Sequence, residues 1–330
     1  MKDEFAFISK IAPIKTYQSS LVQGIGDDAA VYRGSEKMDE VVCVDTMVEG
    51  VHFRRDTLSP YQIGKKGLAI NVSDLAAMGA IPAFYLVSIA IPSSWNEEEL
   101  AEIYRGMDEL ATRYNMDLIG GDTVSTDGPL VLTVTVMGRV ERNQAKYRHQ
   151  ANAGDVVFLT GYVGSSAAGL ELLFDKGVGG EFTVAEQVLV HAHQEPTPHV
   201  EAGRILATFH ERISLNDVSD GVASEANELA EASKVKVTIE ADALPFHESM
   251  KNFSREKQLD WALFGGEDFV LIGTVAKEYV NKLSERFRKR NVLFFEIGNV
   301  EAGEPGVFLK DGQQVTRLEK HGYNHFQKRG

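Results

Sequence analysis

Each half of this chain carries the same two kinds of acidic, glycine-bearing segment, and this recurrence strongly constrains the fold. The first half has Gly26-Asp27-Asp28 and Gly120-Gly121-Asp122, and the second has Asp217-Val218-Ser219-Asp220 and Gly265-Gly266-Glu267-Asp268. Because glycine permits tight turns, chance recurrence of ordinary turn sequences is the alternative interpretation. We expect two structurally related halves whose acidic turns lie at strand ends.

The spacing of apolar residues predicts helices that alternate with strands, as in an α/β (α+β type) fold. Leu68, Val72 and Leu75 share one face of a helix that begins after Ser59-Pro60. We expect Asp45-Thr46 at the end of a strand over 41–44. We expect Gly120-Gly121-Asp122 to form a turn after a short strand. Further helices are expected over 5–11, 100–114, 165–174 and 277–289, and further strands over 29–32, 83–91, 130–140, 155–160, 213–217, 269–272 and 292–297.

Two domains are expected, because 330 residues exceed the roughly 250–300 at which a single core stops growing. Residues 141–153 lose the apolar periodicity and become polar, as linkers do. We therefore predict an N-terminal domain over 1–140, a linker over 141–153 and a C-terminal α/β domain over 154–330.

Charge and composition exclude several classes of protein. A net charge of −14 argues against nucleic acid as a partner. No apolar run approaches the roughly 20 residues of a membrane span, and the acidic start Met1-Lys2-Asp3-Glu4 does not resemble a signal peptide, so we expect a cytoplasmic protein without a membrane partner. A single cysteine, Cys43, excludes an internal disulfide and a cysteine metal cage.

The acidic residues are candidates for a metal site. Carboxylates brought together repel one another unless cations neutralise them, and oxygen ligands suit Mg²⁺ or Ca²⁺. Mg²⁺ prefers one or two carboxylates together with phosphate oxygens, which indicates a polyphosphate ligand. The candidate ligands are Asp27, Asp28, Asp45, Asp74, Asp122, Asp217 and Asp220. The alternative is that these aspartates lie in acidic turns exposed to solvent.

Common nucleotide-binding motifs are missing. The sequence has no P-loop, no G-x-G-x-x-G at a strand–helix junction and no His-Arg-Asp catalytic loop. An ATP enzyme of those kinds is therefore excluded.

An ordered set of motifs resembles the thiamine-monophosphate kinase family, from near residue 24 to the C-terminus. The motifs are Gly24-Ile25-Gly26-Asp27-Asp28-Ala29-Ala30, the segments 44–53 and 71–80, Gly120-Gly121-Asp122-Thr123, Asp217-Val218-Ser219-Asp220-Gly221, Gly265-Gly266-Glu267-Asp268-Phe269 and Gly322-Tyr323-Asn324-His325-Phe326. The resemblance implies the two-domain aminoimidazole-ribonucleotide-synthetase-like fold, with an N-terminal sheet domain that forms a homodimer interface and a C-terminal α/β domain that completes the active site.

The resemblance also implies Mg²⁺-dependent, in-line transfer of the γ-phosphoryl group of ATP to thiamine monophosphate, giving thiamine diphosphate. By motif, the seven aspartates would hold several Mg²⁺ ions, with Asp27 in a supporting role. Tyr104, Gly121, Asp122, Arg148 and Ser219 would contact ATP. His52, Glu267 and Tyr323 would line the thiamine monophosphate pocket.

Two alternatives remain open at this point. A sister synthetase of the same superfamily could act on another acceptor, although a selenophosphate synthetase would need a cysteine in an N-terminal glycine-rich segment, where Cys43 does not lie. The second alternative, from a different functional class, is a non-catalytic module that binds Ca²⁺ or Mg²⁺.

Overall fold

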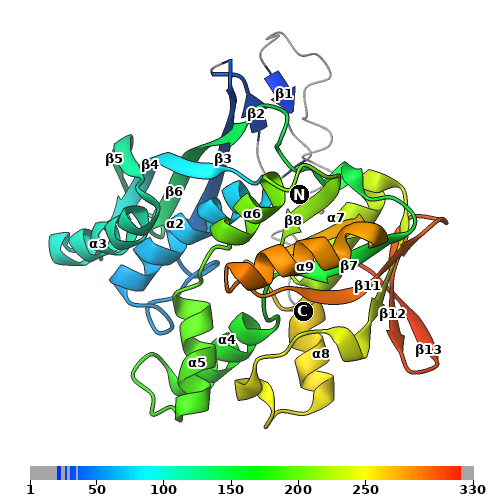
Figure 1. Ribbon diagram of the computed structural model, residues 1–330. Coiled ribbons are helices and arrows are strands. Elements are labelled where there is room, and N and C mark those ends of the chain that lie inside the picture. The colour runs from blue at the N-terminus through cyan, green and yellow to red at the C-terminus, as the bar shows by residue number, and fades with distance from the viewer. Residues whose placement is uncertain (1–20, 24–26, 28–29, 35, 321–330) are drawn as a thin grey trace.

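Two mixed β-sheets, one from each half of the chain, form the framework of the computed structural model, which describes residues 21–23, 27, 30–34 and 36–320 (Figure 1). In pairing order, the first sheet comprises β1 (Leu21–Gln23), β2 (Ala30–Tyr32), β3 (Met38–Val48), β6 (Val131–Glu141), β4 (Ile81–Pro92) and β5 (Asp117–Thr126). The second comprises β13 (Gln314–Leu318), β12 (Gly306–Asp311), β9 (Lys236–Glu240), β11 (Phe295–Glu301), β7 (Asp155–Leu159), β10 (Leu271–Ala276) and β8 (Ile213–Asp217).

Helices cover both sheets. The α-helices are α2 (Pro60–Ala77), α3 (Glu97–Tyr114), α4 (Ser165–Lys176), α5 (Val184–Gln194), α6 (Val200–Ala207), α7 (Val222–Ser233), α8 (Arg255–Phe264) and α9 (Val280–Lys289). Short 3₁₀ helices are η1 (Arg148–Gln150), η2 (Ala241–Ala243), η3 (Glu248–Met250) and η4 (Lys277–Tyr279). None of the helices within the described ranges combines the length and apolar character that a membrane crossing needs.

The first sheet has one covered and one open face. Along β3, Val41, Cys43 and Met47 are buried, whereas Val44 is 56% exposed. Successive strand residues point to opposite faces, so one face packs against α2 and α3 while the other remains open in the single chain (Figure 1).

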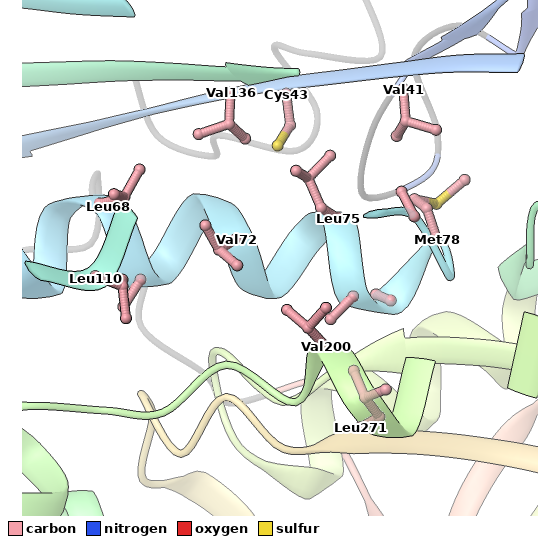
Figure 2. Close-up of a cluster of buried hydrophobic side chains, with 14 of the residues drawn as sticks. Val41, Cys43, Leu68, Val72, Leu75, Met78, Leu110, Val136, Val200 and Leu271 are labelled. Carbon is pink, nitrogen blue, oxygen red and sulfur yellow. The ribbon is translucent and has the colours of Figure 1, made fainter. Parts of the chain in front are cut away.

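Helix α2 is the central element of the molecule. It starts at Ser59, whose hydroxyl accepts from the backbone N–H of Gln62 while the Gln62 side chain accepts from the Ser59 N–H. Figure 2 shows α2 between the first sheet, which contributes Cys43 and Val136, and the second half of the chain, which contributes Val200 and Leu271. Residues of both halves therefore share one core, and the predicted domain limits 1–140, 141–153 and 154–330 remain a prediction.

Two glycines let α2 and α3 approach closely. A Cβ on Gly64 would lie 1.8 Å from the carbonyl oxygen of Ile103, and a Cβ on Gly106 would lie 1.9 Å from that of Tyr61. No larger residue fits at either position without separating the helices. This contact sets how α2 lies across the sheet.

Most predicted elements are present, including α2, α3 and the strands around 83–91 and 130–140. The helix expected over 5–11 lies outside the described residues. Two local predictions are wrong. Strand β3 continues through Asp45 to Val48 instead of ending before it, and Gly120-Gly121-Asp122 lies inside β5 rather than in a turn.

The glycines of β5 serve strand packing. Gly120 and Gly121 pair with Leu86 and Val87 of β4, and a Cβ on Gly121 would lie 1.9 Å from the Val87 carbonyl oxygen. Glycine is therefore required there by the close approach of β4, which the sequence of the segment alone does not reveal.

Candidate active site

A cleft of about 1060 Å³ lies between the two halves of the chain. Its walls come from β3 and the loop after it, α2, α4, α8, and the loops that follow β8 and α8. Seven of the residues predicted from the sequence line it: Asp45, His52, Asp74, Asp217, Ser219, Asp220 and Glu267.

Carboxylates gather at one end of the cleft. Asp45 on β3 is hydrogen-bonded to Asp74 on α2; burial raises the pKa of Asp45, and this bond partly opposes the rise. Burial raises the pKa of Asp217 to about 6, although a hydrogen bond from Ser73 and the nearby Arg148 oppose the rise. Ionising crowded, buried carboxylates is costly without cations, so this donor set fits hard divalent metals.

Among the described residues, no group of three or more histidine, cysteine, aspartate or glutamate side chains is close enough to hold a metal ion. Mg²⁺ takes few protein ligands when phosphate oxygens complete its shell.

Glu225 in the first turn of α7 fixes the acidic loop after β8. Its Oε1 accepts from the Asp220 N–H at 3.1 Å and from the Ser219 hydroxyl at 3.2 Å, and its Oε2 accepts from the Asn216 amide at 2.6 Å. Burial first, and then the neighbouring Glu228, raises the pKa of Glu225 well above its ordinary value. Sequence analysis missed Glu225, although an acidic residue in the first turn of a helix is a recognisable signal.

Arg148 and Asp27 lie together behind this loop. The Arg148 guanidinium donates to Asn216 Oδ1 at 3.1 Å and pairs with Glu228 at 3.0 Å, while its backbone N–H donates to Asp27 Oδ2 at 3.2 Å. Neither residue lines the cleft. Asp28, the neighbouring candidate, lies outside the described residues.

Aromatic side chains also line the cleft. Phe174 of α4, Trp261 and Phe264 of α8, and Phe269 contribute to it, and Glu171 and Asp260 of the same two helices line it as well. His52 lies on the wall from the first half, and its Nδ1 accepts from the Val48 N–H at 2.9 Å. The aromatic side chains suit a flat organic group. Tyr323, the third predicted substrate residue, lies outside the described residues.

Glu267 has buried partners that sequence analysis missed. Its Oε2 lies 2.8 Å from Lys66 Nζ on α2 and 3.3 Å from His193 Nδ1 on α5. Its backbone has φ +70°, a conformation that costs energy for a residue with a side chain. The only sequence signal is that Lys66 precedes an otherwise largely apolar stretch of helix.

Besides Arg148, three predicted ATP contacts do not reach the cleft in the single chain. Tyr104 of α3 packs partly buried against the core. Asp122 pairs with Ser88 in the row of residues that includes Thr46, so it lies on the open face of the sheet, and Gly121 precedes it in the same exposed strand. Asp45, one residue before Thr46, points to the opposite face. Roles for Gly121, Asp122 and Tyr104 remain predictions.

Comparisons with known proteins agree over nearly the whole chain. Residues 26–140 match the family described as AIR synthase related protein, N-terminal domain, and residues 152–310 match AIR synthase related protein, C-terminal domain. The chain is 50% identical to the thiamine-monophosphate kinase of Bacillus subtilis, covering 98% of this chain and 99% of the relative. It is 35% identical to that of Escherichia coli K12, covering 98% of both.

Comparisons with solved structures agree with these sequence matches. The thiamine-monophosphate kinase of Stenotrophomonas maltophilia is 32% identical with a TM-score of 0.78, covering 95% of this chain and 98% of the other. A structure described as AaThiL complexed with AMPPCP and TMP is 30% identical with a TM-score of 0.83, covering 98% and 97%. The hydrogenase maturation protein HypE in complex with ATP, at 17% identity and a TM-score of 0.68 over 89% and 88%, shares the fold.

Proposed function

The chain belongs to the thiamine-monophosphate kinase family, and we propose that it transfers the γ-phosphoryl group of ATP to the phosphate of thiamine monophosphate, giving thiamine diphosphate and ADP. The observation that carries this proposal is the lining of one cleft by both carboxylates and aromatic side chains, together with His52 and Glu267. The carboxylates suit a metal-bound polyphosphate, and the aromatic side chains suit the rings of thiamine.

The acidic end would hold the metal and the nucleotide phosphates. Asp45, Asp74, Asp217 and Asp220 line it and would hold Mg²⁺. When bound, Mg²⁺ neutralises the phosphate charges and so reduces the repulsion between the two anionic substrates. We retain the other proposed metal ligands, Asp27, Asp28 and Asp122, and the proposed ATP contacts, Tyr104, Gly121, Arg148 and Ser219.

The reaction needs positioning more than acid–base chemistry. The acceptor is already a phosphate anion, so its oxygen can attack the γ-phosphorus as the bond to the ADP oxygen breaks, without a strong general base. Ser219 and Asp220 are held in place by Glu225 for this purpose. His52, Glu267 and Tyr323 would orient thiamine monophosphate so that its phosphate points toward the acidic end.

We propose a homodimer that forms through the open face of the first sheet. Val44 on β3 and Val124 on β5 are 56% and 49% exposed there, and β5 leaves a strand edge unpaired. An apolar, open sheet face with an exposed edge is a typical association surface. Gly121 and Asp122 would then lie at the interface, which would bring the nucleotide site close to the partner.

Sedimentation analysis tests this assembly. We expect a dimer for the wild-type chain and a monomer for the Val44→Glu variant, because the charge would be buried in the interface. A dimeric Val44→Glu variant would contradict the proposed surface.

The sister synthetases fit less well. Cys43 is buried under α2, where its thiol donates to the Asn71 carbonyl oxygen at 3.3 Å, so it is not available to a substrate in the cleft. We also propose that the protein works in the cytoplasm, where ATP is available.

Incubation with Mg²⁺-ATP and thiamine monophosphate tests the activity. We expect thiamine diphosphate and ADP to accumulate in equal amounts by chromatography, and no product with free thiamine as the acceptor. ADP with free phosphate, or no turnover despite bound ATP, would contradict the proposal.

A further inference from the structure

Lys66 is a fully buried cation behind the wall of the cleft, in contact with two residues that line it, Glu267 and His193. Its side chain has no exposed surface, and its ammonium lies 2.8 Å from Glu267 Oε2 and 3.5 Å from His193 Nε2. Because α2 belongs to the first half of the chain and Glu267 to the second, this ion pair crosses between the halves. Burying a lysine is costly unless a charged partner compensates, so the pair is a defined feature of the site.

The three groups form one hydrogen-bonded unit. His193 is neutral, because burial first, and then Lys66, lowers its pKa to about 3. A neutral imidazole that accepts from Lys66 at Nε2 carries its proton on Nδ1, which is hydrogen-bonded to the Ser166 hydroxyl at 3.1 Å and lies 3.3 Å from Glu267 Oε2. The hydrogen bond that Glu267 Oε2 accepts therefore comes from Lys66, with the neutral His193 ring beside it.

Glu267 stays ionised in this environment. Burial by itself raises the pKa of its carboxyl, but Lys66, His193 and the nearby His52 outweigh this effect and hold the pKa below its ordinary value. The adjacent Asp268 is turned away to the N-terminus of α4, where it accepts from the backbone N–H groups of Gly164 and Ser166.

The second oxygen of Glu267 faces the cleft. Within the described residues, the ion pairs and hydrogen bonds of this carboxylate all use Oε2, and the side chain is 32% exposed. Glu267 also lines the cleft, as do Trp261 and Phe264 of the preceding helix α8. An acceptor fixed in a cleft that also presents aromatic rings is a suitable partner for an N–H group on a flat heterocycle.

We propose that Lys66 is a positioning residue of the substrate site: it holds Glu267 so that Oε1 alone accepts a hydrogen bond from the amino group of the substrate's pyrimidine. This inference rests on the proposed function. It also implies that Glu267 does not balance the positive charge of the thiazolium, because Lys66 already compensates its negative charge.

Kinetics with two acceptors test the inference: thiamine monophosphate and an analogue with hydrogen in place of the pyrimidine amino group. For the wild-type protein, we expect the KM for the analogue to be at least about tenfold higher than the KM for thiamine monophosphate, because Glu267 Oε1 would have no hydrogen-bond donor to pair with. In Lys66→Met, the KM for thiamine monophosphate should rise about tenfold and the two acceptors should become equivalent, with the KM for ATP within about twofold of wild type.

Lys65→Met is the matched control. Lys65 precedes Lys66 on α2 and also makes ion pairs, but with Glu109 and Glu195 rather than with Glu267. We expect it to keep the wild-type preference between the two acceptors.

A second variant, Glu267→Gln, covers the case in which Lys66→Met fails to fold. Lys66 donates, so the amide oxygen of the glutamine must face it and its NH₂ must face the cleft. The NH₂ of the glutamine and the amino group of the pyrimidine would then both be donors facing each other. The preference for the aminopyrimidine should therefore again disappear.

Two results would overturn the inference. In the first, Lys66→Met or Glu267→Gln keeps the full preference for thiamine monophosphate over the analogue. In the second, Lys66→Met raises the KM for ATP and for both acceptors equally, which indicates a structural role alone. Absence of transfer in the wild-type protein is a different result, because it contradicts the proposed function; calorimetric binding of the two acceptors then still tests the preference.

Discussion

The hydroxyl of Ser73 on α2 donates a 2.6 Å hydrogen bond to Asp217 Oδ2 at the end of β8. Asp74, the next residue on α2, lines the acidic end of the cleft. Helix α2 therefore supplies one carboxylate and orients another that comes from the second half of the chain.

Ser73→Ala should lower stability and activity together. The hydrogen bond has a charged acceptor, so its loss should reduce the free energy of unfolding by about 1–3 kcal/mol and slow transfer by roughly tenfold. Urea unfolding and initial rates measure the two effects, with the exposed Ser94→Ala as the control. Unchanged activity would show that Asp217 is positioned without Ser73.

Glu225→Ala should impair catalysis more than folding. Without Glu225, the Ser219 hydroxyl and the Asp220 N–H lose their acceptor and the acidic loop loses its fixed position. We expect transfer to fall roughly 10- to 100-fold. Glu231→Ala on the same helix, which removes only an exposed pair with Lys320, should leave the rate near wild type. Equal rates in the two variants would contradict the role of Glu225.

His193 should make the protein less stable in acid. Burial first, and then Lys66, lowers its pKa to about 3, below the ordinary 6.5. The unfolded chain therefore takes up a proton below pH 6.5 that the folded protein does not bind, so acid favours unfolding. Through this group, the free energy of unfolding should fall by up to about 1.4 kcal/mol per pH unit between pH 6.5 and 3.

Denaturant unfolding between pH 7 and 4.5 measures this dependence. His193→Gln should show a shallower fall than the wild-type protein. The same slope in both proteins would mean that other groups cause the loss.

Gly64→Ala should destabilise the fold through the contact between α2 and α3. The added methyl would lie 1.8 Å from the Ile103 carbonyl oxygen, so the helices must separate, at a cost of at least about 2 kcal/mol. Gly179→Ala is the control, because its Cβ would meet nothing within 4 Å. Similar unfolding midpoints for the two variants would contradict this packing.

Part of the candidate site follows from sequence motifs. Asp45, Asp74, Asp217 and Glu267 stand out in these motifs, and all four line one cleft, whereas their roles stay predictions. Gly120-Gly121 was interpreted as a turn, because only the pairing of β5 with β4 shows that these glycines serve close packing.

Residues that act through other residues were also missed. Lys66, His193 and Glu225 belong to no acidic motif, and their roles depend on partners brought close by folding. Lys66 and Glu267, for example, are 201 positions apart in the chain. Such long-range contacts leave no local pattern in a single sequence.

The central claim is that the carboxylates of the cleft serve phosphoryl transfer and its aromatic side chains bind the thiamine rings, and steady-state kinetics of one pair of variants test it most directly. Asp45→Asn removes a carboxylate from the cleft lining, and Phe174→Ala removes an aromatic ring from it. We expect Asp45→Asn to lower kcat by at least about 1000-fold with little change in the KM for thiamine monophosphate. Phe174→Ala should raise that KM about tenfold and leave kcat nearly unchanged. The reverse pattern, or wild-type kcat in Asp45→Asn, would contradict the account.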